Sequence, residues 1–489
     1  MKRCSAITLG AVSVGVLATV AVWTRQRRTT ASRISQTRSA RNSQLLKLSA
    51  TSSARWARHQ ARRRFANAGR QAELDEAFQM QTARDVTEAL GNLKGAFMKL
   101  GQMASYLDFG LPEAARDTLG ELQRDAPPMS AELAASVIVE QLGARPEELF
   151  DTWDEAPIAS ASIGQVHRAI THDGRAVAVK VQYPGVAEAV GSDLANSDVV
   201  FGVLKMAFGG LETGPIIEEL RARLTEELDY ELEARNQQYF ANYYQGHPTI
   251  RIPSVVPELS SAQVLTSELA VGARFEDVVQ WSQAQRDLAA ETMYRFTFGS
   301  IYQLGAFNGD PHPGNYLFEP DGVVTFLDFG LVKRYDSAET ELFGTLIRKM
   351  VVDEDIAGFR SYAVTAGLIP ADAPQSNDEI QAYFSHFYSF VMDEQPFRLT
   401  EEYAAAGVRQ IFDTSSEHAE LMKLLNIPPA FVITQRINLG LMSLFGRLNA
   451  SADWRALSEE LWPWSDGPAS TPMGHAAMAW RKRHSEVAD

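Results

Sequence analysis

The sequence predicts a two-lobed α+β fold, and three observations support this prediction. The chain has 489 residues, which exceeds one ordinary domain and suits two or three packed units. Helical patterns give way to a strand-rich region near residue 150, and the chain becomes mainly helical again after Gly272. A short pair of strands carrying polar residues interrupts this second helical region. Because binding sites of two-lobed proteins form between the lobes, we expect the functional residues there.

The N-terminal region combines an apolar segment with a basic arm. Residues 7–23 carry no charge and would extend about 25 Å as a helix, against a bilayer core of about 30 Å. Residues 1–70 hold 15 Lys and Arg but no Asp or Glu, whereas the remainder holds 31 basic and 61 acidic residues. We therefore expect a single-pass membrane anchor with the body on the cytoplasmic side. A cleaved signal peptide and an organelle-targeting peptide are the alternatives.

Charge and cysteine content exclude several classes of protein. An acidic body is a poor nucleic-acid binder, because phosphate contacts require Lys and Arg. The basic arm instead suits the anionic face of a membrane. The single cysteine, Cys4, excludes both a disulfide framework and a cysteine-based zinc or iron–sulfur site.

Composition and pattern divide the chain into six expected regions. These are a membrane anchor or targeting segment (1–28), a basic juxtamembrane region (29–84), a helical extension (85–150), a strand-rich N-lobe (151–271), a helical C-lobe (272–460) and a tail (461–489).

Hydrophobic periodicity predicts the elements within these regions. Ser130 begins a helix that Gly143 ends, and the run that leads to Val181 predicts a β-hairpin with its turn at Asp173–Gly174. An apolar stripe at helical spacing comprises Leu90, Leu93, Phe97, Leu100 and Ala104. Further helices are predicted at Pro184–Gly209 and Ile216–Tyr244, and further strands at 254–259, 263–272, Tyr316–Phe318 and Val323–Leu327. In the C-terminal region, Phe431, Met442 and Phe445 are predicted to be helical core residues.

The most specific chemical signal is a group of three polar residues around the short strand pair. Asp310 and Asn315 have the D-x-x-x-x-N spacing of a kinase catalytic loop, and Asp328 opens a D-F-G sequence. Phosphoryl transfer needs a carboxylate near the attacking hydroxyl, which we assign to Asp310. Mg²⁺ prefers hard oxygen ligands, which Asn315 and Asp328 would supply. The competing interpretation is a Pro- and Gly-rich turn with an exposed aspartate.

Lys180 ends the run Val177-Ala178-Val179-Lys180 on an otherwise apolar predicted strand. A buried lysine needs anionic partners, and nucleotide phosphates together with a helix carboxylate would supply them. An edge-strand lysine that points into solvent is the alternative.

Acidic residues gather between residues 226 and 233. Asp229 and Glu233 stand four residues apart on one face of the predicted helix, and Glu226 and Glu227 extend the acidic stretch. Taken alone, this pattern is also typical of a solvated acidic face.

The loop before the lysine hairpin has a single glycine, Gly164, where an ordinary kinase has three. Its backbone amides can still donate to phosphates, and the expected nucleotide contacts are Ala159, Ser160, Ala161, Ser162, Ile163 and Gly164. His167 follows the loop, and we interpret it as a structural hydrogen-bonding residue.

Together these motifs resemble the UbiB/AarF family of atypical kinases over about residues 85–335. The markers are K-x-G-Q from Lys99 to Gln102, the alanine-rich loop before Gly164, E-x-D…E-A-x-N from Glu227 to Asn236, D-P-H-P-G-N and D-F-G. Where the family often has His-Ala before its catalytic Asp, this chain has Asn308-Gly309. The resemblance implies a bilobal protein-kinase-like fold with its helical extension packed over the cleft.

The resemblance also implies the roles of individual residues. Lys180 would pair with Glu233 and hold the nucleotide phosphates, and Asp310 would act as the catalytic base. Asn315 and Asp328 would carry Mg²⁺. The extension that covers the cleft would include Lys99 and Gln102, together with Glu227 and Asp229, and its presence disfavours protein substrates.

The function implied is an atypical kinase or ATPase that uses ATP and Mg²⁺ near isoprenoid lipids. Its partners would be a membrane lipid or quinone precursor and a biosynthetic protein complex, in support of quinone biosynthesis. One alternative is a small-molecule phosphotransferase of the aminoglycoside or choline kinase type. Another is a nucleotide-binding pseudokinase scaffold, although such a scaffold would not need to keep the metal ligands.

Overall fold

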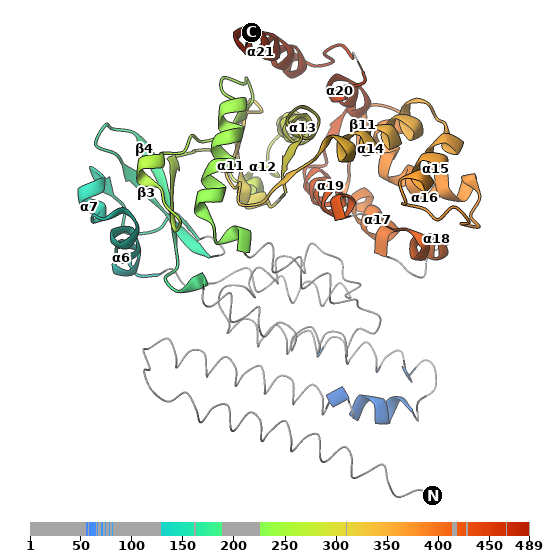
Figure 1. Cartoon of the computed structure of the whole chain (residues 1–489), viewed down its shortest axis with the longest axis horizontal. Helices are drawn as coiled ribbons and strands as arrows, with labels where there is room; N and C mark the ends of the chain where they lie inside the picture. The colour runs from blue at the N-terminus through green and yellow to red at the C-terminus, as the bar shows by residue number, and fades with distance from the viewer. Residues whose placement is uncertain are drawn as a thin grey trace, which may run out of the picture.

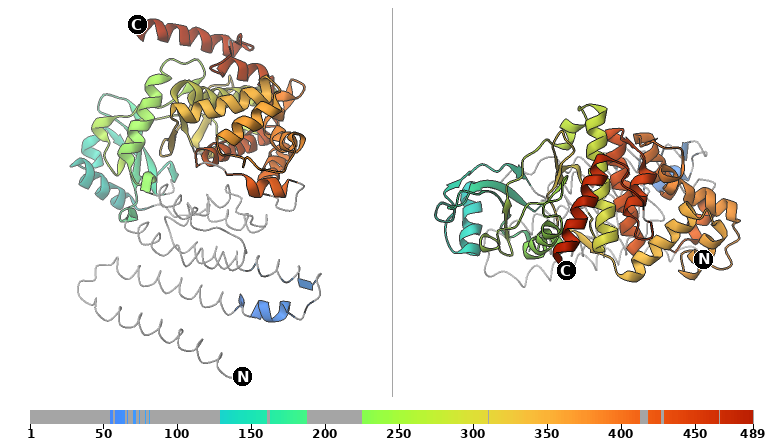
Figure 2. Two further views of the ribbon diagram at one scale, coloured as in Figure 1. Left: turned by 45° about the vertical axis from the view of Figure 1, so that its right-hand side comes forward. Right: turned by 90° about the horizontal axis from the view of Figure 1, so that it is seen from above.

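The computed structural model describes residues 129–187 except 161–162, residues 225–488 except 310, 413–417, 427–428 and 466, and parts of 55–81. Within these residues a unit built around an antiparallel sheet lies beside a mainly helical unit (Figure 1). Both views of Figure 2 keep the sheet and the helices on opposite sides. This architecture is α+β and bilobal, as the sequence predicts.

The N-lobe sheet places Lys180 on an interior strand. The strand order is β1-β3-β4-β6, all neighbours are antiparallel, and β2 pairs with β3. The predicted hairpin is confirmed, since β3 and β4 flank a turn in which Gly174 has φ 83°. The strands are β1 (Thr152–Trp153), β2 (Ala159–Ser160), β3 (Gly164–Ile170), β4 (Ala176–Gln182) and β6 (Val264–Glu268).

Every second side chain of β4 points to the same face of the sheet, and this face is fully buried. Val177, Val179 and Val181 have no exposed surface, and α6 (Ala131–Leu142) packs against them. The side chain of Ser130 caps this helix and Gly143 ends it in the left-handed region, as predicted. α6 falls in the range expected to form the extension, yet its apolar face belongs to the core of the sheet.

The helix α11 (Tyr230–Tyr243) crosses beside the sheet and contacts β6. The sequence predicted one helix over Ile216–Tyr244, but among the described residues this helix is interrupted at Leu228 and Asp229, between the helical residues 225–227 and α11. Asp229 is the N-cap of α11, where its side chain accepts a hydrogen bond from Leu232 N at 2.8 Å. Because an N-cap residue has non-helical backbone angles, Asp229 and Glu233 do not share a helical face.

Small strands position the polar loops of the C-lobe. The predicted strand pair is confirmed as β8 and β9, joined by a turn in which Gly322 has φ 90°. A short strand, β5, pairs in parallel with β9, and β7 pairs with β10. These elements are β5 (Ile250–Arg251), β7 (Ala306–Asn308), β8 (Tyr316–Phe318), β9 (Val324–Phe326) and β10 (Val332–Arg334).

Helices around a buried central helix form the remainder of the C-lobe. α13 is buried along most of its length, and Phe445 and Met442 lie in the same core, as predicted. The strands β11 (Phe397–Arg398) and β12 (Ser451–Ala452) pair beside it. The helices are α7 (Pro146–Leu149, in the N-lobe), α12 (Phe275–Val278), α13 (Gln283–Gly299), α14 (Ser337–Ile347), α15 (Ile356–Thr365), α16 (Asn377–Met392), α17 (Glu401–Phe412), α18 (Ala419–Leu424), α19 (Pro429–Leu448), α20 (Trp454–Leu461) and α21 (Pro472–Ala488), with π-helical turns at Ser300–Leu304 and Arg348–Val352.

A buried ion-pair network holds the C-terminal segment on the C-lobe. Arg295 of α13 donates to Glu460 at 2.7 Å and to Glu291 at 2.8 Å, and the Arg295 side chain is 2% exposed. Thr471, which precedes α21, accepts a hydrogen bond from the same guanidinium at 3.1 Å. Further along α21, Trp480 donates to the Gln245 carbonyl at 3.0 Å, just beyond the end of α11.

Two strand predictions need correction. Residues 254–259 were predicted to form a strand, but they contribute only one bridge, Val255 to Ser267, and a 3₁₀ turn over Pro257–Leu259. Pro257 lacks the backbone donor that a strand ladder requires. The C-lobe also contains strands that the sequence did not predict, including β7 and β10.

Several predicted elements lie outside the described residues. They include the apolar segment 7–23, the stripe from Leu90 to Ala104 and most of the helix predicted at Pro184–Gly209. No helix in the described part of the chain has both the length and the apolar character that a membrane span requires.

Candidate nucleotide-binding site

An ion pair between β4 and α11 forms the centre of the candidate site. Lys180 Nζ on β4 lies 2.8 Å from each carboxylate oxygen of Glu233 on α11. The side chains are 18% and 3% exposed, respectively. The edge-strand alternative for Lys180 is therefore wrong, because β4 is an interior strand. The solvated-face alternative is wrong for Glu233, which is buried.

Asp328 of the C-lobe lies close to this ion pair. Its Oδ2 lies 4.0 Å from Lys180 Nζ, and its side chain is 33% exposed. Gly330 N donates to Asp328 Oδ1 at 3.0 Å, which fixes the carboxylate in an Asx-type turn. The Asn308 side-chain amide donates to the Asp328 carbonyl. Asn308 stands where the resembling family often has a histidine, so here an amide connects the catalytic-loop segment to the D-F-G sequence.

Burial and charge act in opposite directions on the two members of the pair. Burial disfavours the ammonium of Lys180, but the carboxylates of Glu233 and Asp328 outweigh it and raise the Lys180 pKa well above its usual value. Burial raises the pKa of Glu233 to about 7, against the attraction of Lys180, and the nearby Asp328 carboxylate adds to the increase. The site thus holds a strongly retained cation beside a carboxylate that binds a proton near neutral pH.

The phenylalanine of the D-F-G sequence packs against α11. Phe329 is fully buried, and its ring lies 5.1 Å from the ring of Phe240. Asn236 Nδ2 donates to the Phe329 carbonyl at 3.2 Å, and Arg334 donates to Asn236 Oδ1 at 3.4 Å. These contacts join α11, which carries Glu233, to the segment that carries Asp328.

The candidate phosphate loop closes tightly onto the sheet at Gly164. A Cβ on Gly164 would lie 2.3 Å from the Val181 carbonyl oxygen and 2.9 Å from the Tyr230 hydroxyl, so only glycine fits there. Ile163 is buried and its carbonyl accepts from Tyr183 N at 2.9 Å. Of the other predicted contacts, Ala159 and Ser160 form the exposed strand β2, and Ala161 and Ser162 lie outside the described residues.

His167 is a structural residue, as the sequence analysis expects. Its Nδ1 lies 2.9 Å from the Asp154 carbonyl, and its Nε2 lies 2.8 Å from Gln165 Nε2. Because the carbonyl can only accept, Nδ1 carries the proton and Nε2 accepts from the Gln165 amide. Burial lowers the pKa of His167, which favours this neutral form. Gln165 Oε1 in turn accepts from Met129 N at 2.9 Å.

The metal-ligand candidates Asn315 and Asp328 lie on neighbouring segments. The Asn315 carbonyl accepts from Leu327 N at 3.0 Å, which holds Asn315 beside the residue before Asp328. The described residues contain no cluster of three His, Cys, Asp or Glu side chains able to hold a metal ion. An amide and a carboxylate oxygen suit Mg²⁺, which commonly takes one or two protein ligands and completes its shell with water and phosphate. Asp310 lies outside the described residues.

The residues assigned to the extension are only partly described. Lys99 and Gln102 lie outside the described residues. Asp229 caps α11, and the charge of Glu227 contributes to the raised pKa of Glu233. The structure thus brings Glu227 near the ion pair and gives Asp229 a local structural contact.

Two residues with contacts to the site carried no functional assignment from the sequence. Asn308 was noted only as a departure from the family pattern, although a polar residue within the apolar strand β7 indicates a buried hydrogen bond. Tyr230 was not singled out, and its position directly after the acidic pair gives little indication of burial. Its ring lies over Lys180 Nζ at 4.8 Å.

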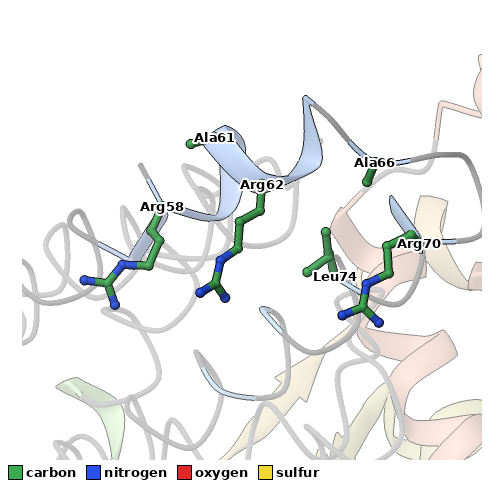
Figure 3. A pocket seen from close by; sticks show the side chains of 6 residues that line it. All are labelled: Arg58, Ala61, Arg62, Ala66, Arg70 and Leu74. Atoms are coloured by element: carbon green, nitrogen blue, oxygen red, sulfur yellow. The ribbon is translucent and has the colours of Figure 1, made fainter.

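A basic hollow lies apart from this site. It measures about 730 Å³ and is lined by Arg58, Arg62, Arg70, Ala61, Ala66 and Leu74 (Figure 3). Its helical segment lies at the opposite end of the molecule from α21 (Figure 1). The hollow therefore shares no residues with the Lys180 site.

Known proteins are similar to this chain in sequence and in fold. The ABC1 atypical kinase-like domain matches residues 121–363. The AarF domain-containing protein kinase 1 of Mus musculus is 32% identical over 295 residues, which cover 59% of this chain and 56% of that protein. The mitochondrial atypical kinase COQ8B of Rattus norvegicus is 32% identical over 272 residues, which cover 54% and 51%, respectively. The chain thus spans about half the length of these curated relatives.

A solved structure extends the similarity over most of the chain. Rv3197 from Mycobacterium tuberculosis, determined in complex with erythromycin, is 32% identical with a TM-score of 0.60. The match covers 80% of this chain and 98% of that one. The fold is kinase-like, and the chain belongs to the ABC1/AarF family of atypical kinase-like proteins.

Proposed function

We propose that this chain binds Mg²⁺-ATP between its lobes and transfers or hydrolyses the terminal phosphoryl group. One observation carries the proposal: Lys180, Glu233 and Asp328 come from three separate segments, and Lys180 Nζ lies 2.8 Å from Glu233 and 4.0 Å from Asp328. A lysine held by a buried carboxylate, with a second carboxylate on the opposite lobe, is the arrangement that nucleotide kinases use. The strongly raised pKa of Lys180 supports a permanent cation for the phosphates.

Each residue has a separate role in the proposed reaction. Lys180 would orient the nucleotide phosphates, while Glu233 and the cap of α11 would fix the lysine. Asn315 and Asp328 would hold Mg²⁺, which supplies charge neutralisation for the phosphates when bound. Asp310 would accept the proton of the attacking hydroxyl or water.

The wider role that we propose is regulation of lipid or isoprenoid quinone metabolism at a membrane. The support is the family membership together with the basic, acid-free arm of residues 1–70. The segment 7–23 would act as a single-pass anchor with the kinase-like body on the cytoplasmic side. Organelle targeting remains the competing proposal, because relatives carry mitochondrial or chloroplastic names.

Thermal unfolding and phosphate release test the proposal on the full chain in mild detergent. Wild type, Lys180→Ala and Asp328→Asn would be compared with and without Mg²⁺-ATP. Nucleotide at 100 times its dissociation constant should add about 2.7 kcal/mol to the free energy of unfolding. We expect this stabilisation and a slow phosphate release in wild type, and no phosphate release from either variant.

The same experiment separates the other functions. An unchanged unfolding temperature at millimolar ATP would reject nucleotide binding altogether. Stabilisation without phosphate release would favour the pseudokinase scaffold. Phosphate transfer that requires an added small hydroxyl compound would favour a small-molecule phosphotransferase, and vesicles with isoprenoid alcohols would test the lipid role. Erythromycin belongs in the same panel because the Mycobacterium tuberculosis relative was solved with it.

A further inference from the structure

Tyr230 lies between the two elements that are proposed to hold the nucleotide phosphates. It is the first residue of α11 and is 1% exposed. The Lys180 ammonium lies over its ring, 4.8 Å from the ring centre. On the other side, the Tyr230 hydroxyl lies against Gly164, 2.9 Å from the point where a Cβ would be. One side chain therefore contacts both the phosphate-binding lysine and the glycine of the loop.

The Tyr230 hydroxyl is buried and has no hydrogen-bond partner among the described residues. An unpaired buried hydroxyl costs free energy, and most buried polar groups in folded proteins are hydrogen-bonded. A phenylalanine would fill the same buried space without the hydroxyl. A buried hydroxyl that finds no partner among the described residues therefore points to a partner that arrives with a ligand.

We propose that Tyr230 is a phosphate-binding residue, whose hydroxyl donates a hydrogen bond to an oxygen of the bound nucleotide's phosphates. The inference rests on the proposed nucleotide binding and adds a residue to that site.

Two features select a phosphate oxygen as the partner. The ammonium that would hold the phosphates lies 4.8 Å from the centre of the tyrosine ring, and we infer that an oxygen bound to Lys180 can reach the hydroxyl of the same ring. No side chain separates the hydroxyl from the loop backbone, because the adjoining residue is Gly164. Burial raises the pKa of Tyr230, so the hydroxyl keeps its proton and acts as a donor at neutral pH.

The variant Tyr230→Phe separates this role from a purely structural one. It keeps the ring over Lys180 and removes only the hydroxyl. In the absence of nucleotide we expect an unchanged or higher unfolding temperature, since no hydrogen bond is lost. The affinity for ADP and ATP with Mg²⁺ should fall about tenfold, because hydrogen bonds to charged groups are among the stronger ones. The affinity for adenosine should not change.

A tyrosine elsewhere in the core serves as the matched control. The Tyr294 hydroxyl is buried and paired with Ser458 Oγ at 2.5 Å, in the C-lobe. Tyr294→Phe should lower the unfolding temperature and leave the affinity for ADP unchanged, which is the opposite pattern to Tyr230→Phe.

Calorimetric titration of the full chain distinguishes the outcomes. If wild type binds ADP and Tyr230→Phe binds it equally well, the role of Tyr230 is rejected and the proposed function stands. An equal loss for ADP and adenosine would also reject the phosphate contact. If wild type binds neither ADP nor ATP, the proposed function fails and the inference fails with it.

Discussion

Replacing Lys180 by methionine would leave a carboxylate buried without its cation. Glu233 has a side chain only 3% exposed, and both of its oxygens lie 2.8 Å from Lys180 Nζ. Removing one member of a buried ion pair typically costs 3–5 kcal/mol, because the other charge is left uncompensated. We expect Lys180→Met to cost about 3 kcal/mol at pH 8, the lower end of that range, because Glu233 can take up a proton.

The partner substitution should cost less. In Glu233→Met the Lys180 ammonium still has the Asp328 carboxylate 4.0 Å away. The Lys180 side chain is also 18% exposed, so the ammonium is neither unpaired nor fully dehydrated. The double variant replaces both charges by apolar groups of similar length and should lie within about 1 kcal/mol of wild type. The two single costs would then exceed the double cost by about 2 kcal/mol or more, which measures the coupling.

Urea unfolding followed by tryptophan fluorescence and circular dichroism provides the assay, with coincident transitions required before free energies are compared. If the single costs add to within about 0.5 kcal/mol, Lys180 and Glu233 do not interact and the geometry of the site is wrong. The double variant also separates stability from function, because it should fold normally and yet lose nucleotide-induced stabilisation.

Three further predictions concern pH, the loop and the C-lobe. Since the Glu233 pKa is raised to about 7 in the folded protein, wild type should lose stability relative to Glu233→Gln as pH rises from about 4.5 through 7, and the loss should level off near about pH 8, in urea titrations across pH. Gly164→Ala should cost about 1–3 kcal/mol, because its Cβ would lie 2.3 Å from the Val181 carbonyl oxygen, and the urea midpoint would show it. Arg295→Met should cost about 3–5 kcal/mol in the same assay, because it leaves the fully buried Glu460 side chain without its cation.

The sequence predicts well those features that depend on neighbouring residues. The hairpin around Gly174, the helix between Ser130 and Gly143 and the strand pair before Asp328 all follow from alternation, caps and turn glycines. The position of Lys180 on an apolar strand also follows from the pattern, although the pattern alone left an edge strand open.

Contacts between distant segments could not be predicted from pattern alone. Lys180 and Glu233 are 53 positions apart, and only the family resemblance implied that they pair. The acidic residues around Glu233 favoured a solvated helix face. That interpretation was wrong for Glu233, because its partner Lys180 lies on another element, β4. The same applies to β5 (Ile250–Arg251), whose two residues become a strand only by pairing with β9.

Asp229 and Tyr230 show why neighbours in an acidic motif can have unrelated roles. Helical spacing groups Asp229 with Glu233, but the helix begins one residue later and turns Asp229 into a cap. The next side chain, Tyr230, has its hydroxyl against Gly164 and its ring beside Lys180. Since a cap fixes where a helix begins, losing it should disturb the register of both Tyr230 and Glu233 at once. In the proposed site Asp229 would then act on the nucleotide through Tyr230 and Glu233, and not by direct contact.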